Sequence, residues 1–210
     1  MHILPILFFG LAANLDNLGI GISYGVRKVR IPFLSNFFIA LLSGIVAALS
    51  VLTGALLSRV VDWANVAGSV LLIAIGIWVA WPKHSQELAL PVSAPVSKTY
   101  SVPVKPLGLF IEITKDPSLA DLDANGFISA KEAIVLGLTL SINCIATGVS
   151  AGLTGLAPLP MALSVFLFSM AAISAGYITG WRTAAQRFER AAQYLSGAML
   201  IFIGIWEYLH

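Results

Sequence analysis

The sequence repeats itself at Gly10-Leu-Ala-Ala-Asn-Leu-Asp-Asn-Leu-Gly-Ile-Gly-Ile-Ser-Tyr-Gly25 and Gly137-Leu-Thr-Leu-Ser-Ile-Asn-Cys-Ile-Ala-Thr-Gly-Val-Ser-Ala-Gly152. The two stretches align without a gap, so that each leading and closing glycine has a partner. The alignment also sets Asp16 against Asn143, both polar residues in apolar surroundings. We interpret the stretches as equivalent helices that open two related halves of the chain.

Apolar segments long enough to cross a bilayer, about 20 residues each, occur three times in each half. The whole chain is 58% hydrophobic and only 10% charged, against roughly 25% charged residues in soluble proteins. We therefore predict an all-α integral membrane protein with six transmembrane helices. The segments are Leu4–Tyr24, Leu34–Ser58, Ala64–Trp81, Ala133–Leu153, Ala162–Gly180 and Ala191–Leu209.

An odd number of crossings per half makes the second half enter the membrane from the opposite side. The sequence thus predicts two inverted three-helix repeats, an arrangement common in secondary transporters. We assign the first repeat to residues 1–81 and the second to 133–210. Between them lie a proline-rich linker at 82–120, whose composition is typical of extended chain, and a loop at 121–132.

Basic residues indicate the orientation, because cytoplasmic flanks retain Lys and Arg. Eleven of the twelve basic residues fall on one side of the predicted membrane, and only Arg59 falls on the other. We expect a multi-pass protein of the cell (inner) membrane, with the linker and the loop at 121–132 in the cytoplasm and both termini outside. The basic residues are divided among three loops, which does not indicate a nucleic-acid partner.

Asp16 is the only acidic residue well inside a predicted span, where a carboxylate costs at least ~2.5 kcal/mol. Ser23, seven positions further on, returns to the same helix face, and Asn14 and Asn17 flank that face. In the fourth span, four polar residues follow a helical spacing and form one stripe. These residues are Thr139, Asn143, Thr147 and Ser150.

If the two repeated helices cross near the membrane centre, Asp16, Asn143 and nearby hydroxyls would form an oxygen-rich site with one negative charge. Such a site suits a hard cation or a proton. The alternative is structural: the amides and hydroxyls bind neighbouring helices, and Asp16 stays protonated or paired. Ionisable residues at this depth are usually functional, so we favour the cation site.

The loop Asp121-Leu-Asp123-Ala-Asn125-Gly126-Phe-Ile-Ser-Ala-Lys-Glu132 fits the EF-hand calcium loop at every specified position. The pattern supplies side-chain oxygens, a sharp turn at glycine, a carbonyl and a final bidentate carboxylate. It predicts a site for Ca²⁺ or another hard cation just before the fourth helix. The predicted ligands are Asp121, Asp123, Asn125, Phe127, Ser129 and Glu132. The alternative is an acidic turn that only caps the helix.

Three motifs also resemble a known family: Asn14-Leu-Asp16-Asn17, Gly19-Ile-Gly21-Ile-Ser-Tyr-Gly25, and the segment from Asp116-Pro117 through Glu132 to Leu136-Gly137. Together they resemble the YtaF family of sporulation membrane proteins, over nearly the whole chain. That family is similar to the MntP manganese exporters of the LysE-like transporter group. The resemblance implies an inverted six-helix fold and efflux of a divalent cation, with Asp16 in the role of the exporters' first-helix acid.

We therefore predict a membrane transporter that exports a divalent cation such as Mn²⁺, with a link to sporulation. Asn143 stands where the exporters look acidic, which leaves the identity of the ion open. The alternative is a sporulation scaffold that does not transport and uses its calcium-type loop to order a partner. The scattered histidines and the lack of a nucleophile with a base argue against an enzyme. The partners are the lipid bilayer and the metal ion, and the sequence leaves a homo-oligomer open.

Overall fold

The computed structural model describes residues 3–60, 62–80, 120–121, 125–182 and 186–209. These residues form helices and one isolated β-bridge, with no strand among them. The linker predicted at 82–120, apart from Ala120, lies outside the described residues, as does Asp123. The helices are α1 (Ile3–Ala12), α2 (Leu15–Arg27), α3 (Phe33–Leu57), α4 (Ala64–Ala80), α6 (Ala130–Leu153), α7 (Pro158–Arg182) and α8 (Gln186–Leu209).

Three stretches of helix are long and apolar enough to cross a membrane: Ile3–Arg27, Phe33–Leu57 and Pro158–Trp181. Helix α6 joins them if its two parts, bent by 48°, are taken as one span. The apolar helices Ala64–Ala80 and Tyr194–Leu209 are shorter. The prediction of an all-helical, multi-pass membrane protein is confirmed, while helix length alone supports three to four of the six predicted spans.

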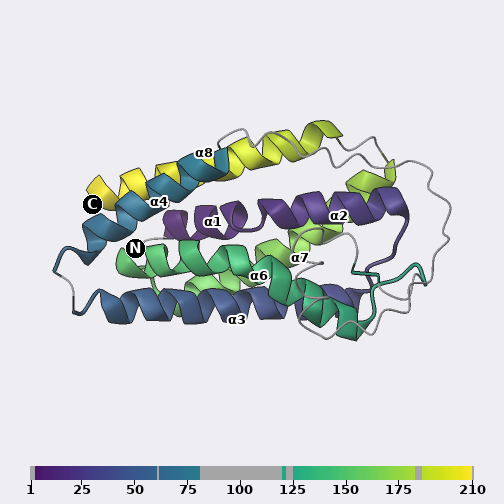
Figure 1. Cartoon of the computed structure of the whole chain (residues 1–210), viewed down its shortest axis with the longest axis horizontal. Coiled ribbons are helices and arrows are strands. Elements are labelled where there is room, and N and C mark those ends of the chain that lie inside the picture. The colour runs from purple at the N-terminus through teal and green to yellow at the C-terminus, as the bar shows by residue number, and fades with distance from the viewer. Residues whose placement is uncertain (1–2, 61, 81–119, 122–124, 183–185, 210) are drawn as a thin grey trace, which may run out of the picture.

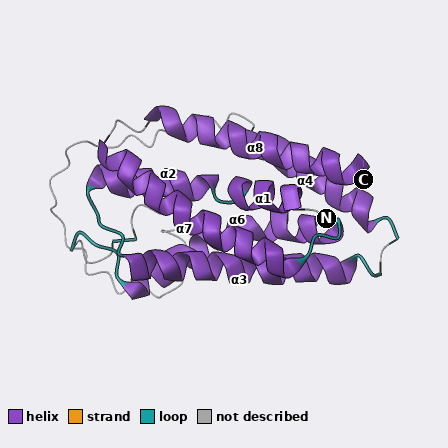
Figure 2. Cartoon of the chain, turned by 180° about the vertical axis from the view of Figure 1, so that it is seen from behind, coloured by secondary structure: helices purple, strands orange, loops and turns teal. Residues whose placement is uncertain are grey.

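The helices lie side by side along one long axis (Figure 1). The chain runs one way through α1 and α2, returns through α3, and reverses again in α4. The second half, α6 to α8, repeats these three passes in the opposite directions (Figure 1). The most extensive helix contacts are α3 with α6, α2 with α7, α4 with α8, and α3 with α7. Figure 2 shows the same order from behind, with α8 and α3 on opposite edges.

Prolines and a glycine mark the turns between helices. Pro32 precedes the first residue of α3, and Pro158 is the first residue of α7, a position where the missing N–H costs nothing. Gly155, with φ of +86°, turns the chain between α6 and α7, a conformation that glycine adopts without strain. These turns reverse the chain direction, but each helix packs mainly on helices of the other half of the chain and not on the next helix in sequence.

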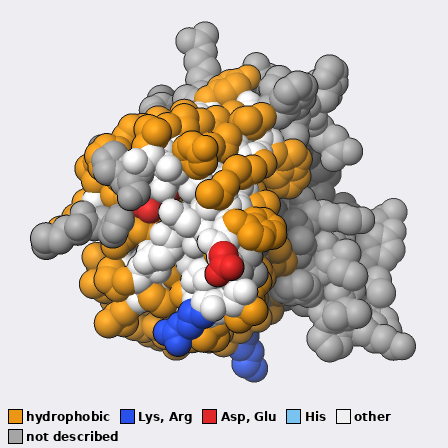
Figure 3. Space-filling model, turned by 90° about the vertical axis from the view of Figure 1, so that its left-hand side faces the viewer, with side chains coloured by type: hydrophobic (Ala, Val, Ile, Leu, Met, Phe, Trp, Pro, Cys, Tyr) orange, Lys and Arg blue, Asp and Glu red, His pale blue; other side chains and the backbone are white. Residues whose placement is uncertain are grey.

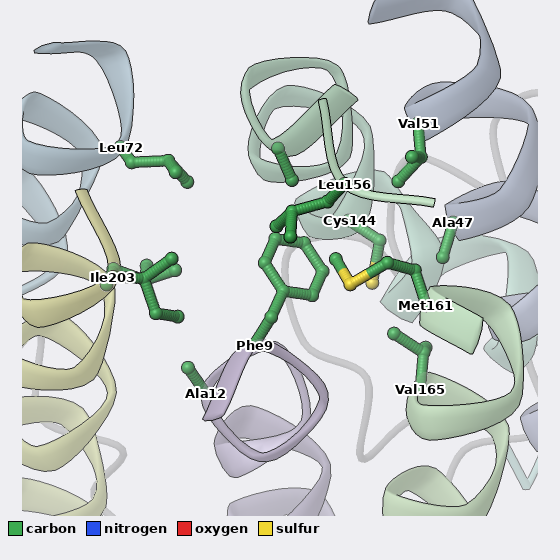
Figure 4. Packing of buried hydrophobic residues seen from close by; sticks show 12 residues of the cluster. Phe9, Ala12, Ala47, Val51, Leu72, Cys144, Leu156, Met161, Val165 and Ile203 are labelled. Atoms are coloured by element: carbon green, nitrogen blue, oxygen red, sulfur yellow. The ribbon is translucent and has the colours of Figure 1, made fainter. Parts of the chain in front are cut away.

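Two apolar clusters form the core, one toward each end of the bundle. The first includes Phe9 of α1, which points toward Cys144 of α6 and Met161 of α7 (Figure 4). The second contains Tyr24, Ile39, Ile128, Leu136, Leu140 and Ile173, with Ala120 and Ala133. Cys144 is 2% exposed and packs within the first cluster.

The outer surface of the bundle is mostly apolar. Large side chains such as Leu49, Leu163 and Phe202 are exposed on different helices. Figure 3, which looks onto one end of the bundle, shows hydrophobic side chains around the rim and a few charged side chains toward the middle and bottom. Apolar exposure this extensive is typical of a surface that faces lipid.

Glycines bring two helix pairs into close contact. Gly21 and Gly25 of α2 face Gly176 and Gly180 of α7, and a methyl group on any of the four would meet backbone atoms of the other helix. Gly54 of α3 and Gly152 of α6, which face each other, make the corresponding contact in the second pair. Small residues four apart allow membrane helices to approach at their backbones.

We expect Gly180→Val to destabilise the bundle, because a Cβ at this position would overlap the carbonyl oxygen of Ile22. Overpacking of a filled interface typically costs about 1–3 kcal/mol. The thermal unfolding temperature in detergent should fall. Ala175→Val is the matched control, since Ala175 is exposed on the same helix; equal unfolding temperatures for the two variants would show that the α2–α7 contact is not close.

Candidate functional site

The first span is broken at its centre. Helix α1 ends at Ala12 and α2 begins at Leu15, with Asn14 in a non-helical conformation (φ −121°, ψ 10°) between them. The break leaves backbone groups that lipid cannot satisfy. The Ser196 hydroxyl of α8 donates a 2.8 Å hydrogen bond to the Ala12 carbonyl and satisfies one of them.

The fourth span departs from a straight helix at the equivalent position. Its parts Ala130–Ile142 and Cys144–Leu153 meet at Asn143 with a bend of 48°. Asn143 is the residue that the repeat aligns with Asp16; its side chain lies outside the described set. Broken or bent helices near the membrane centre are typical of substrate and ion sites in secondary transporters.

Two asparagines next to the break bind each other and α7. The Asn14 amide donates to the carbonyls of Gly10 (2.7 Å) and Val165 (3.2 Å). The Asn17 amide donates to Asn14 Oδ1 (2.8 Å) and to the hydroxyl of Ser169 (3.0 Å). Asn17 is 2% exposed, and its own Oδ1 has no hydrogen-bond partner among the described residues.

These asparagines belong to a layer of polar side chains between the two apolar clusters. On α7, Ser169 lies between Val165 of the first cluster and Ile173 of the second. The same alternation recurs on α3 and α6, where Ser43 and Ser141 are fully buried and their hydroxyls are 3.4 Å apart. We call Asn14, Asn17, Ser43, Ser141 and Ser169 the polar layer.

Asp16 sits at the edge of this layer, in the first turn of α2, with its side chain exposed. The backbone N–H of Asn17 donates to Asp16 Oδ1 at 2.8 Å. The start of a helix carries partial positive charge, which stabilises a carboxylate at that place. Asp16 also lies near enough to the Cys144 thiol of α6 for an electrostatic interaction.

The remaining residues of the predicted site are placed as follows. Thr139 and Ser150 are buried, and their hydroxyls donate to carbonyls of their own helix, Val135 and Ala146, each at 2.9 Å. Thr147 is buried on the same helix. Ser23 Oγ is buried and has no partner within the described chain. The structure thus joins Asn14 with Asn17 directly, while Thr139 and Ser150 satisfy their own backbone.

Sequence reasoning missed the polar residues of the second span in each half. Ser43 and Ser169 are single small residues in apolar runs, and nothing local separates them from ordinary helix packing. The repeat alignment does not reveal them either, because its offset sets Ser43 against Met170 and not against Ser169. Asn36 and Glu207, 4% and 3% exposed, were also missed.

The described residues of the loop at 121–132 form a turn held by hydrogen bonds between side chains and backbone. Asp121 accepts hydrogen bonds from the backbone N–H of Asn125 and of Gly126, both at 3.2 Å, and Asn125 Oδ1 accepts from Phe127 at 2.9 Å. Gly126 has φ of +81°, as the sharp turn requires. These bonds direct the oxygens of Asp121 and Asn125 toward the inside of the turn.

The end of the loop also caps α6. The Ser129 hydroxyl accepts from the Glu132 N–H, and the Glu132 carboxylate accepts from the Ser129 N–H at 2.8 Å, which is a capping box. Glu132 is 5% exposed. Within the described residues, no three His, Cys, Asp or Glu side chains gather to hold a metal, and Asp123 lies outside that set. The capping role that sequence offered as the alternative is therefore observed.

The loop is attached to the start of the helix bundle. Arg30, between α2 and α3, pairs with it through two backbone hydrogen bonds of 2.9 Å, one to Gly126 and one from Ile128. The Ser35 hydroxyl of α3 donates to the Ile128 carbonyl at 2.7 Å. The Ile128 side chain is 0% exposed and belongs to the second apolar cluster. The loop and the ends of α2 and α3 form one packed unit.

Comparison with known proteins agrees with this architecture. The sequence model of one family, described as "Mntp: Putative manganese efflux pump", matches residues 1–80 and 114–207. The chain is 33% identical to "Probable sporulation protein YtaF" of Bacillus subtilis (strain 168), over 99% of this chain and 100% of that protein. No solved structure matches.

The family description is that of a pump, a membrane transporter and not an enzyme. The match covers both halves of the chain and includes the loop at 121–132, and the relative matches along its whole length. The chain therefore belongs to the Mntp family, and the resemblance inferred from its motifs is confirmed.

Proposed function

We propose that this protein transports a divalent cation across the membrane, with Mn²⁺ as the first ion to test and efflux as the direction. The observation that carries the proposal is the polar layer, which lies at the break of the first span and the bend of the fourth. Buried oxygens and one carboxylate suit hard ions such as Mn²⁺, Mg²⁺ and Ca²⁺. The family description supports manganese in particular.

The transport unit we propose is an inverted repeat of six spans, with α4 and α8 as the third and sixth. Support comes from the helix contacts. Each contact named next has a counterpart in which the equivalent helices of the two halves have changed places. Helix α2 packs on α7 as α6 packs on α3, and α1 meets α8 as α6 meets α4. Gly76 against Gly197 likewise corresponds to Gly204 against Ser69 in the α4–α8 contact.

Asp16 supplies the negative charge of the proposed site, and Asn143 supplies an amide from the opposite half. The half that contains Asp16 also contributes Asn14, Asn17 and Ser23. The bent helix α6 contributes Thr139, Thr147 and Ser150. With one carboxylate, the site would hold a divalent ion less tightly than a site with two. Moderate affinity is compatible with release on the far side of the membrane.

The proposed orientation places the loop at 121–132 in the cytoplasm, because basic residues flank that end of the bundle. There the loop would take a hard cation through Asp121, Asn125, Phe127, Ser129 and Glu132, with Asp123, which lies outside the described residues. Since it is bonded to Arg30 and Ser35, a bound cation would stiffen the ends of α2 and α3. We therefore propose a role in sensing cytoplasmic metal.

A second candidate function is a membrane scaffold linked to sporulation, in which the loop orders a partner. The packing of Ile128 into the bundle joins the loop and the membrane helices in one unit, which favours the scaffold. The name of the relative carries the sporulation link. A scaffold needs no charge at position 16, whereas a transporter does, and this difference separates the two.

We expect Asp16→Ala to reduce Mn²⁺ flux in proteoliposomes by at least about 10-fold, because the only charge at the proposed site is lost. Asp16→Asn, which keeps the size, should lose flux to a similar extent. Asp62→Ala, in the exposed turn before α4, is the matched control and should transport like the wild type. Wild-type flux in Asp16→Ala would show that this carboxylate is not part of the transport site, whereas no flux in any of these proteins, the wild type included, would favour the scaffold.

We expect Glu132→Gln to weaken Ca²⁺ or Mn²⁺ binding to the full chain by at least about 10-fold, because the bidentate carboxylate is lost. Glutamine still fits the capping box, so α6 should start normally. Calorimetric titration in detergent measures the affinity, with the exposed neighbour Lys131→Gln as control. Equal affinities in both variants would mean that the cation does not use this loop.

A further inference from the structure

Asn36 in the first turn of α3 repeats the signature of Asn17 at a different depth. Its amide nitrogen donates to the Met170 carbonyl (3.1 Å) and to the Ser174 hydroxyl (2.9 Å) of α7. The side chain is 4% exposed, and Oδ1 is buried with no hydrogen-bond partner among the described residues. In both asparagines the amide nitrogen donates a hydrogen bond to α7, while the amide oxygen has no hydrogen-bond partner among the described residues.

A buried oxygen without a donor destabilises the folded state, because it has lost its hydrogen bonds to water. Native proteins retain such groups mainly where water, an ion or a functional step uses them. Ser23 Oγ on α2 is a third oxygen of this kind. Asn17 and Ser23 lie on α2 and Asn36 lies on α3, and both helices pack on α7. This common location indicates that the three oxygens serve the same function.

Asn17 belongs to the polar layer, and Ser23 and Asn36 lie between that layer and the end of the bundle that carries the loop. Asn36 follows Ser35, whose hydroxyl binds the loop at Ile128. The residues of α7 that hold Asn17 and Asn36, Ser169 and Ser174, are five positions apart, roughly 7–8 Å along the helix. In this structure Tyr24, Ile39 and Ile173 of the second apolar cluster pack in the same region; a hydrated ion could pass only after they separate.

We propose that Asn36 Oδ1 is a binding position for a partly hydrated divalent cation on its way between the cytoplasm and the polar layer. The inference rests on the proposed transport function and adds a site on the cytoplasmic side of it. An amide oxygen suits this step, because it replaces one water of a hard cation without holding the ion as a carboxylate does.

Flux measurements separate this role from simple helix packing. Asn36→Leu removes the oxygen and should slow Mn²⁺ flux about 10-fold, equivalent to 1.4 kcal/mol in the barrier, while Mn²⁺ affinity in detergent changes little. Ser174→Ala removes a hydrogen bond from the same amide but keeps its oxygen, and should transport like the wild type. Equal losses in both variants, or none in Asn36→Leu, would overturn the proposal.

A labelling experiment tests the position even if the chain moves no metal. Cys144→Ala removes the only cysteine, and Asn36→Cys then introduces one. A cationic methanethiosulfonate reagent should label this cysteine from the cytoplasmic side, and Mn²⁺ should slow the labelling. Ala40→Cys, one turn deeper and fully buried, is the control and should stay unlabelled. No labelling at position 36, or labelling that Mn²⁺ does not slow, would overturn the proposal independently of transport.

Discussion

Polar side chains at the centre of a membrane bundle must find their hydrogen bonds on neighbouring helices, since lipid offers none. In this protein that requirement fixes how the helices meet. Asn14 and Asn17 bind α7 through Val165 and Ser169, and Ser43 of α3 reaches Ser141 of α6. Apolar clusters close the bundle on both sides of this layer. The break in the first span is tolerated because Ser196 satisfies one of the freed carbonyls.

Close glycine contacts complement the polar layer and hold two helix pairs together at their backbones. Helices α2 and α7 meet at Gly25 and Gly180 near one end, and α3 and α6 meet at Gly54 and Gly152 near the other. Each pair takes one helix from each half of the sequence. If the protein alternates its access, these mixed pairs are better rigid units than the sequence halves, because backbone contacts hold them. Asp16 lies on one unit and Asn143 on the other, so a bound cation would join them.

A chain of hydrogen bonds connects the loop to the membrane interior. Ile128 of the loop accepts from Ser35, and the adjacent Asn36 donates to Ser174 of α7. Ser169, five positions before Ser174 on α7, accepts from Asn17. Coupling between sites needs a physical link of this kind, although a link alone does not measure coupling. In the EF-hand motif the loop supplies ligands and a turn; in this chain the loop supplies Ile128 to the core of the bundle.

The sequence by itself determined the helical membrane architecture, the equivalence of Asp16 and Asn143, and the loop motif with its glycine turn. Each of these depends on local composition or on a fixed spacing, which survive without knowledge of the fold. Only the tertiary structure decided that Asn14 and Asn17 turn to α7, that Ser43 and Ser169 complete the layer, and that Arg30 pairs with the loop. Those contacts join residues far apart in the chain, so their partners depend on how the helices pack and no local pattern encodes them.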